Sequence, residues 1–187
     1  MISMAVKIYE EYKNIALKPF AEKLQSEYYN AIEISCAASK LQCEKIKSIE
    51  ISESPLQYAV LCLNVIAEIE KHVSNRKQIY MPYVHTLTEK VRDSHDCTNC
   101  SGSCKINHNM HILDLNATNE EMTKVLSRLQ LSTLPLYSET MYPDAYRVLR
   151  SNMTMLETNL TELFFLENNY LIPKIAEAQK NINAGNR

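Results

Sequence analysis

Glycine is scarce in this sequence, with two residues among 187, whereas an average usage of roughly 7% predicts about thirteen. Sheet proteins need glycine in their turns and bulges. The shortage therefore argues against a sheet protein and predicts long helices joined by few, short connections. Tryptophan is absent and phenylalanine occurs three times, while tyrosine occurs eleven times. This balance indicates positions at the edge of a core that need both a ring and a hydroxyl group.

Features that define other classes of protein are also missing. No stretch approaches the roughly 18 uncharged apolar residues of a membrane helix, and the first residues lack the basic and apolar regions of a signal peptide. The formal net charge of -2 provides no electrostatic footprint for nucleic acid. We therefore expect a soluble, cytoplasmic protein that binds neither membranes nor nucleic acid. In that reducing compartment its six cysteines should be free thiols or metal ligands rather than disulfides.

Apolar residues recur at spacings of three and four in three long regions, which is the period of an amphipathic helix. The predicted stripe of the first region is Phe20, Leu24, Tyr28, Ala31, Ile34, Ala38 and Leu41. That of the second is Cys62, Ile66, Ile69, Val73, Tyr80, Val84 and Leu87. That of the last includes Leu149, Met153, Leu156, Leu160, Leu163, Tyr170 and Lys174. These stripes predict three helices that each bury one face.

The expected architecture is all-α: one domain over residues 1–187, folded as an antiparallel up-down four-helix bundle with long helices kinked at internal prolines. We expect helices over about 2–48, 55–92, 119–132 and 143–181, and one irregular Cys-rich loop over 93–117. Capping boxes mark two of the helix starts, Ser54 with Gln57 and Thr118 with Glu121.

Two charged residues occupy positions in these apolar stripes. Arg76 lies between Val73 and Tyr80, and Glu167 follows Leu163; each charged residue precedes a proline by six positions. A buried charge without a partner is costly, so charges at core positions are normally paired or ligate metal. We therefore predict an Arg76–Glu167 salt bridge across the bundle. The alternative is that the stripes are wider and that one or both side chains reach solvent.

With these motifs in place, the chain resembles the hemerythrin-like (HHE cation-binding) family. The resemblance lies in Glu167 followed by Leu171-Ile172-Pro173, and in His72 followed by Tyr80-Met81-Pro82. It implies a four-helix bundle with a di-iron centre that responds to oxygen or nitric oxide, with His72 and Glu167 at ligand positions.

The sequence departs from the family pattern at most ligand positions. Arg76 stands where the resemblance implies a carboxylate, and Leu163 replaces a histidine. The approximate positions in the first and third helices are Tyr28 and Glu121. An arginine beside two cations adds a third positive charge. The resemblance therefore implies the fold, with His72 as a degenerate ligand position, rather than a conventional di-iron site.

A cluster of thiol and imidazole side chains is the clearest chemical signal. His95, Cys97, Cys100, Cys104, His108 and His111 lie within 17 residues. Such ligands suit Zn²⁺, and two thiols separated by two residues form a usual chelate. Cys104 can supply a third thiolate, and His108 or His111 a fourth ligand. The alternatives are an iron–sulfur cluster, a reversible disulfide between Cys97 and Cys100, or a loop with free thiols. The other cysteines, Cys36, Cys43 and Cys62, fit core packing.

The sequence thus predicts a non-catalytic protein that binds metal or responds to redox conditions and that holds zinc or iron in the Cys/His segment. The sequence contains no phosphate loop, nucleophile elbow or HExxH motif that would indicate an enzyme. One alternative is a protein–protein interaction module, including a homodimer, in which the segment is a structural clip. Another is a di-iron protein that responds to oxygen or nitric oxide.

Overall fold

The computed structural model describes residues 11–49, 53–93, 103–133 and 143–184, without the side chains of 54, 103–111, 132–133 and 183–184. All secondary structure in these ranges is helical, as predicted, and it forms four long segments. In chain order they are η1 (Glu11–Asn14), α2 (Leu17–Leu24), η2 (Gln25–Tyr29) and α3 (Asn30–Lys47); α4 (Glu53–Asn75), η3 (Arg76–Tyr80) and α5 (Met81–Arg92); α6 (Ser103–Thr133); and α7 (Asp144–Leu166), η5 (Glu167–Leu171) and α8 (Ile172–Ala184). Within these ranges no helix has both the length and the apolar character needed to cross a bilayer.

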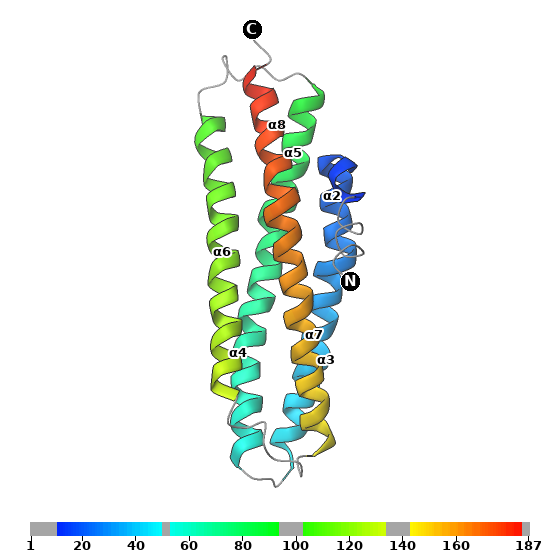
Figure 1. Ribbon diagram of the computed structural model, residues 1–187, viewed down its shortest axis with the longest axis vertical. Helices are drawn as coiled ribbons and strands as arrows, with labels where there is room; N and C mark the ends of the chain where they lie inside the picture. The colour runs from blue at the N-terminus through cyan, green and yellow to red at the C-terminus, as the bar shows by residue number, and fades with distance from the viewer. Residues whose placement is uncertain (1–10, 50–52, 94–102, 134–142, 185–187) are drawn as a thin grey trace.

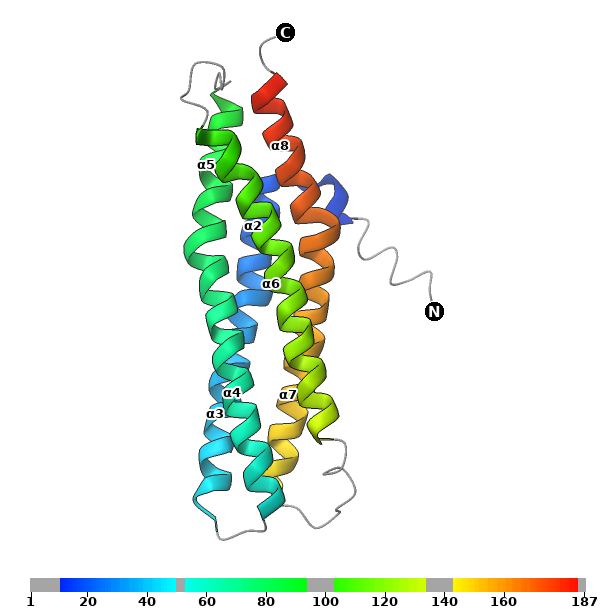
Figure 2. The same ribbon diagram turned by 90° about the vertical axis from the view of Figure 1, so that its left-hand side faces the viewer.

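The four segments lie alongside one another in an elongated molecule (Figures 1 and 2). In Figure 1, α4–α5 and α7–α8 both run from the lower to the upper end, whereas α2–α3 and α6 run downward. Helix α3 packs against α4 and α7, α5 packs against α2 and α8, and α6 packs mainly against α4. The main core therefore lies between the first, second and fourth segments, with α6 along one side.

Apolar side chains at helical spacing form this core. In α7 the buried residues Leu149, Met153, Leu156, Leu160 and Leu163 follow one another at steps of four and three, so they lie on one face. Full burial of each such side chain contributes about 1.5–3 kcal/mol. Cys36, Cys43 and Cys62 are also fully buried, as expected of core residues.

In the described part of the chain, three short π-helical segments interrupt the long helices: η2, η3 and η5. A π-helical turn contains an additional residue, so the helix face that points into the core moves by one position beyond it. Two of the segments end two residues before Pro82 and Pro173. Proline cannot donate a backbone hydrogen bond and its ring clashes with the carbonyl four residues earlier. A wider turn at this point relieves that clash.

The π-helical segments explain why two predicted stripes are wrong by one or two residues. In the first segment the buried residues from the end of η2 onward are Tyr29, Ile32, Cys36, Ser39, Cys43 and Ile46, instead of the predicted series beginning at Tyr28. Ile34 and Leu41 are consequently 71% and 57% exposed. In the last segment Leu171 and Ile175 are buried, instead of Tyr170 and Lys174.

The predicted loop over 93–117 is also wrong for its second part, because α6 begins at Ser103. Apolar residues at steps of three and four run through the predicted loop and into the helix, at Ile112, Leu115, Met122, Leu126 and Leu129, with Asn119 in the same series. The polar run Asn107–His111 obscured this period. Thr118 is inside α6, where its hydroxyl donates to the carbonyl of Asp114 at 2.9 Å. The predicted capping box of Thr118 and Glu121 is therefore wrong.

Candidate functional site

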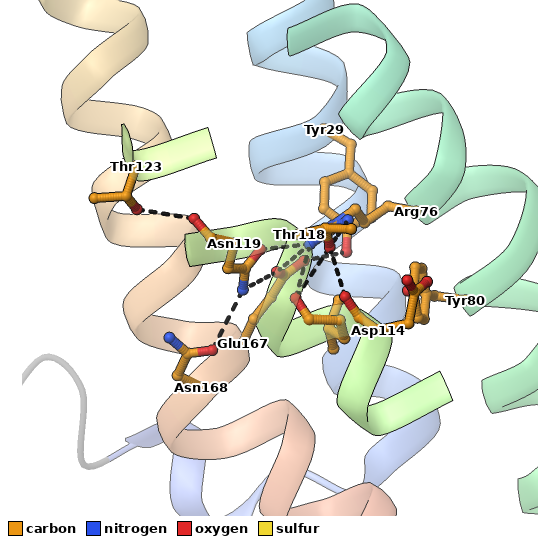
Figure 3. Close-up of polar contacts among 10 residues, drawn as sticks. Tyr29, Arg76, Tyr80, Asp114, Thr118, Asn119, Thr123, Glu167 and Asn168 are labelled. Carbon is orange, nitrogen blue, oxygen red and sulfur yellow. Dashed lines mark hydrogen bonds and ion pairs between the residues drawn. The ribbon is translucent and has the colours of Figure 1, made fainter. Parts of the chain in front are cut away.

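A buried polar cluster lies where the three π-helical segments meet (Figure 3). Tyr29 is the last residue of η2, Arg76 and Tyr80 are the first and last residues of η3, and Glu167 is the first residue of η5. All four side chains are buried in a core that is mostly apolar. π-helical turns often occur at functional sites because they turn a side chain away from its ordinary position. This cluster, together with its partners on α6, is hereafter called the core cluster.

The centre of the core cluster is an ion pair. Arg76 Nη2 lies 3.4 Å from Glu167 Oε2, and both side chains are 0% exposed. The structure therefore brings together the two charges that the sequence placed in the apolar stripes. Removing two charges from water has a large cost, and the pair is stable only when further hydrogen bonds complete both groups.

Glu167 has those additional hydrogen bonds. The hydroxyl group of Tyr29 donates to Oε1 at 3.0 Å, and Nδ2 of Asn119 donates to Oε2 at 2.9 Å. Asn119 comes from α6 and also accepts a hydrogen bond from Arg76 through Oδ1. Both carboxylate oxygens are thus engaged, and Asn119 bridges the two charged groups.

Arg76 connects the cluster to α6. Its Nη1 donates to Thr118 Oγ1 at 3.0 Å, and its Nη2 lies 3.5 Å from the carbonyl of Leu115. The guanidinium also lies over the ring of Tyr80, 5.3 Å from its centroid, and the Tyr80 hydroxyl donates to Asp114 on α6. A single arginine therefore joins the second, third and fourth helical segments.

The two tyrosines of the core cluster remain hydrogen-bond donors. Burial raises the pKa of Tyr29 well above its usual range, and the negative charge of Glu167 raises it further. Burial also raises the pKa of Tyr80, as does its hydrogen bond to Asp114. Neither phenol is a proton donor or nucleophile near neutral pH, so the core cluster has the chemistry of a structural network.

His72, the degenerate ligand position, lies beside the core cluster. The side chain is 5% exposed, its ring centroid is 5.2 Å from that of Phe164, and its Nε2 has no hydrogen-bond partner. Burial, followed by the positive charge of Arg76, lowers the pKa of His72 to about 3. The imidazole is therefore neutral at physiological pH.

The residues in and around the core cluster do not fit a di-iron centre. Arg76 occupies it with a positive charge, and Glu167 is already used by three partners. At the other positions implied by the resemblance, Tyr28 lies 3.5 Å from Glu162, Glu121 is exposed, and Leu163 is buried. Across the residues that the structure describes, no three His, Cys, Asp or Glu side chains are grouped as a metal site would require.

The Cys/His segment lies largely outside the described residues. This is so for His95, Cys97 and Cys100, and the side chains of Cys104, His108 and His111 are not described either. The backbone of the last three belongs to α6. Their spacing of four and then three residues corresponds to one side of an α-helix. The part of the segment from Cys104 onward is therefore helical rather than a loop.

The thiols that the structure does describe are not reactive. Burial raises the pKa of Cys36 and Cys62 to about 12 and that of Cys43 to about 11. Because the thiolate is the nucleophile and the metal ligand, these three cysteines are inert in the folded protein. Thiol chemistry must therefore involve the other three cysteines, Cys97, Cys100 and Cys104.

Comparison with protein-family models, curated proteins and solved structures gave no match. The functional argument therefore depends on the residues of this chain.

Sequence reasoning missed Tyr29 and partners that α6 supplies to the core cluster, among them Asn119 and Asp114. Tyr29 was hidden by the one-residue register change after η2. Asn119 had a recognisable signal, because it is a polar residue at a stripe position between Leu115 and Met122. The same reasoning that identified Arg76 and Glu167 would have identified Asn119 if the helix had been predicted to begin earlier.

Proposed function

We propose that this protein binds a metal ion, zinc or iron, or acts as a thiol redox sensor, through the Cys/His segment at residues 95–111. The observation that carries the proposal is the position of Cys104, His108 and His111 within α6. Two potential ligands separated by four residues on a helix can bind the same ion, as the two histidines of HExxH motifs do. Cys97 and Cys100 precede α6 and have chelate spacing of their own.

The core supports this assignment by elimination. The core cluster already contains a paired and hydrogen-bonded carboxylate and guanidinium, and the buried thiols have raised pKa values. Neither group favours binding of a cation. The available thiols and most of the imidazoles belong to the segment, which contains three of the six cysteines and three of the five histidines.

In this proposal the helices form the scaffold: one domain, an antiparallel up-down four-helix bundle related to the hemerythrin-like architecture, in a cytoplasmic setting that keeps thiols reduced. Zinc held by thiolates and imidazoles would fix the start of α6 against the chain before it. Without metal, hydrogen peroxide would oxidise the two thiols of Cys97 and Cys100 to a disulfide, with two molecules of water as the other product, and a thiol reductant would reverse the step. This disulfide would constrain the residues that precede α6 in the sequence.

Metal content tests the proposal. Protein purified anaerobically without a histidine tag is expected to contain about one zinc or iron per chain, measured by inductively coupled plasma mass spectrometry. The double substitution Cys97→Ser with Cys100→Ser should remove that metal. Cys36→Ala with Cys43→Ala is the matched control, because it removes two buried thiols and should leave the metal in place.

A redox sensor has a different signature. In that case the protein contains no metal, and treatment with hydrogen peroxide, which is reduced to water, converts Cys97 and Cys100 to a disulfide that dithiothreitol reverses, detected by mass spectrometry after alkylation. The proposal is rejected if the protein contains no stoichiometric metal and Cys97 and Cys100 form no such disulfide.

A second candidate function, homodimerisation as an interaction module, is favoured by the exposed apolar stripe of α3. The register change after η2 turns Ile34, Ala38 and Leu41 outward, and Ile34 and Leu41 are 71% and 57% exposed. Exposed apolar stripes on helices mark protein interfaces. Sedimentation velocity is expected to show a dimer, and Ile34→Glu with Leu41→Glu should give a monomer. A monomeric wild-type protein at 100 µM, a concentration on the order of weak-interface affinities, would exclude this candidate.

A further inference from the structure

Helix α6 contributes fewer side chains to the core than its length allows. It stands at one side of the bundle in Figure 1 and packs mainly against α4. Over residues 112–131, where its side chains are described, the buried ones are Leu115, Asn119, Met122 and Leu126. Three more apolar side chains of α6 are partly buried: Ile112, Val125 and Leu129. In α7, which has a similar length, eight side chains are buried and all of them are hydrophobic. Less apolar burial therefore holds α6 than holds α7.

The seam between α6 and α4 is open over about two helical turns. A groove of about 530 Å³ lies there, lined from Glu68 to Asn75 on α4 and from Thr118 to Val125 on α6. Side chains along an open seam lack neighbours on one side, so they lose the dispersion contacts that a closed interface provides. Elements with few buried contacts are those that open locally in native proteins.

The polar contacts between the core cluster and α6 are concentrated in one short stretch of that helix. Arg76, Tyr80 and Glu167 all form hydrogen bonds to residues 114–119 (Figure 3). Among the described residues, three of the four groups that accept hydrogen bonds from the Arg76 guanidinium belong to α6, and the fourth is Glu167. The guanidinium therefore lies against α6, and this helix covers it.

Because α6 covers these charges, its docking helps to take them out of water. Removing an arginine and a glutamate from water has a large cost, which their attraction and hydrogen bonds must offset. When α6 leaves, water can replace Thr118 and Asn119 as hydrogen-bond partners of Arg76 and Glu167. Undocking of α6 therefore returns hydration to two charges, and it costs less than separation of a seam that is entirely apolar.

We propose that α6 is a detachable helix. It undocks as a unit while the other three helical segments stay folded, and its hydrogen bonds to Arg76, Tyr80 and Glu167 are the latch that holds it in place. Undocking exposes the buried face of α6 and the Arg76–Glu167 pair. It also moves the start of α6, where the chain continues into the Cys/His segment, whether or not that segment binds a metal.

Hydrogen–deuterium exchange of the native full-length protein, followed by mass spectrometry of its peptides, is the direct test. Amides of α6 over residues 112–131 are expected to exchange at least about tenfold faster than the slowest amides of α3 and α7, because they exchange from the undocked form. Equal protection of α6 and α7 would overturn the proposal. Metal content is measured separately, so the detachable helix and the proposed function can fail independently.

A substitution on another helix shows whether undocking is separate from global unfolding. Ile46 is fully buried on α3, which packs against α4 and α7. Ile46→Val should speed the slowest amides of α3 and α7 by about threefold to tenfold. Amides of α6 should keep the rate that they have in the wild-type protein, since α3 is folded both before and after undocking. If α6 accelerated by the same factor as α3, the helix would open only with the whole bundle and the proposal would be wrong.

Two matched threonine substitutions test the latch. Thr118→Val and Thr123→Val each remove a hydroxyl that donates to a carbonyl of α6, but only the Thr118 hydroxyl also accepts from Arg76. Thr118→Val should speed exchange of the α6 amides about tenfold, because a charged donor loses its partner. Thr123→Val, at an exposed position, should change it by no more than about twofold. Equal effects of the two substitutions would show that the core cluster does not hold α6 in place.

Discussion

Replacing Glu167 with Gln is expected to lower the free energy of unfolding by about 3–5 kcal/mol, because it leaves the Arg76 guanidinium charged and buried without its counter-charge. The change preserves side-chain shape, and the remaining carbonyl oxygen can still accept one hydrogen bond. The loss is therefore electrostatic rather than a packing defect. Urea unfolding at pH 7, followed by circular dichroism at 222 nm, measures the difference.

A surface ion pair of the same protein provides the control. Lys40 and Glu70 approach to 2.6 Å, closer than Arg76 and Glu167, but their side chains are 43% and 38% exposed. Exposed pairs contribute about 0–1 kcal/mol, so Glu70→Gln should have a small effect. The combination of Arg76→Met with Glu167→Gln should lose less stability than the sum of the two single changes, since neither charge is then left alone. A change of less than about 1 kcal/mol in Glu167→Gln, equal to that in Glu70→Gln, would contradict the assignment of the core cluster as a structural ion pair.

The second large effect expected is a loss of stability in mild acid that depends on His72. Its pKa is lowered from 6.5 to about 3 in the folded protein, so only the unfolded chain binds a proton at this residue between those values. The stability that the neutral ring contributes is fully present above pH 6.5 and is lost as the pH falls from 6.5 toward 3. Between pH 6.5 and 5 the loss from this residue alone is about 1.5 kcal/mol.

Two histidine variants isolate this contribution from that of other groups. His72→Gln should flatten the dependence of the unfolding free energy on pH between 6.5 and 5, while His85→Gln, at a half-buried site, should retain the slope of the wild-type protein. Urea unfolding at a series of pH values provides the measurement. Equal slopes in the wild-type protein and His72→Gln would show that His72 is not held in its neutral form by the fold.

The helical class of the protein could be predicted from the sequence because long apolar stripes and scarce glycine both indicate it. The face of each helix that is buried could not be predicted exactly. Before η2 and η5 the predicted stripes are buried, as at Phe20, Leu24 and Leu163. From the last residues of η2 and η5, Tyr29 and Leu171, the buried face is displaced. A π-helical turn depends on tertiary packing around the inserted residue, and a fixed 3.6-residue period contains no information about it.

In the second helical segment the predicted stripe is correct despite the π-helical turn. Its predicted series continues from Val73 through position 76 to Tyr80 and Val84, and these residues are buried. The two successive steps of four residues across η3 absorb the additional residue of the π-helical turn. Steps of four in succession near a proline, as before Pro82, are therefore a sequence signal for such turns.

The composition of the Cys/His segment led to the incorrect prediction of a loop. Thiols, imidazoles and asparagines between Cys97 and His111 suggested an irregular loop, although the apolar period that begins at Ile112 belongs to a helix that starts at Ser103. The ligand-like residues of the second half thus have the spacing of a helix. This changes the proposed metal site from a wrapped loop to two cysteines that precede α6 in the sequence and further ligands at helical spacing on its first turns.

We propose that the function lies in this segment and that the charges in the core have a structural role. Cobalt(II) substitution tests that division most directly, since thiolate ligands produce intense charge-transfer absorption in the near ultraviolet whereas carboxylate and imidazole ligands do not. We predict that the wild-type protein and Glu167→Gln both show the thiolate band with one equivalent of Co²⁺, and that Cys97→Ser with Cys100→Ser abolishes it. A Co²⁺ complex that lacks the thiolate band and is lost on substitution of His72 or Glu167 would instead place the metal in the bundle core and exclude the Cys/His segment as its site.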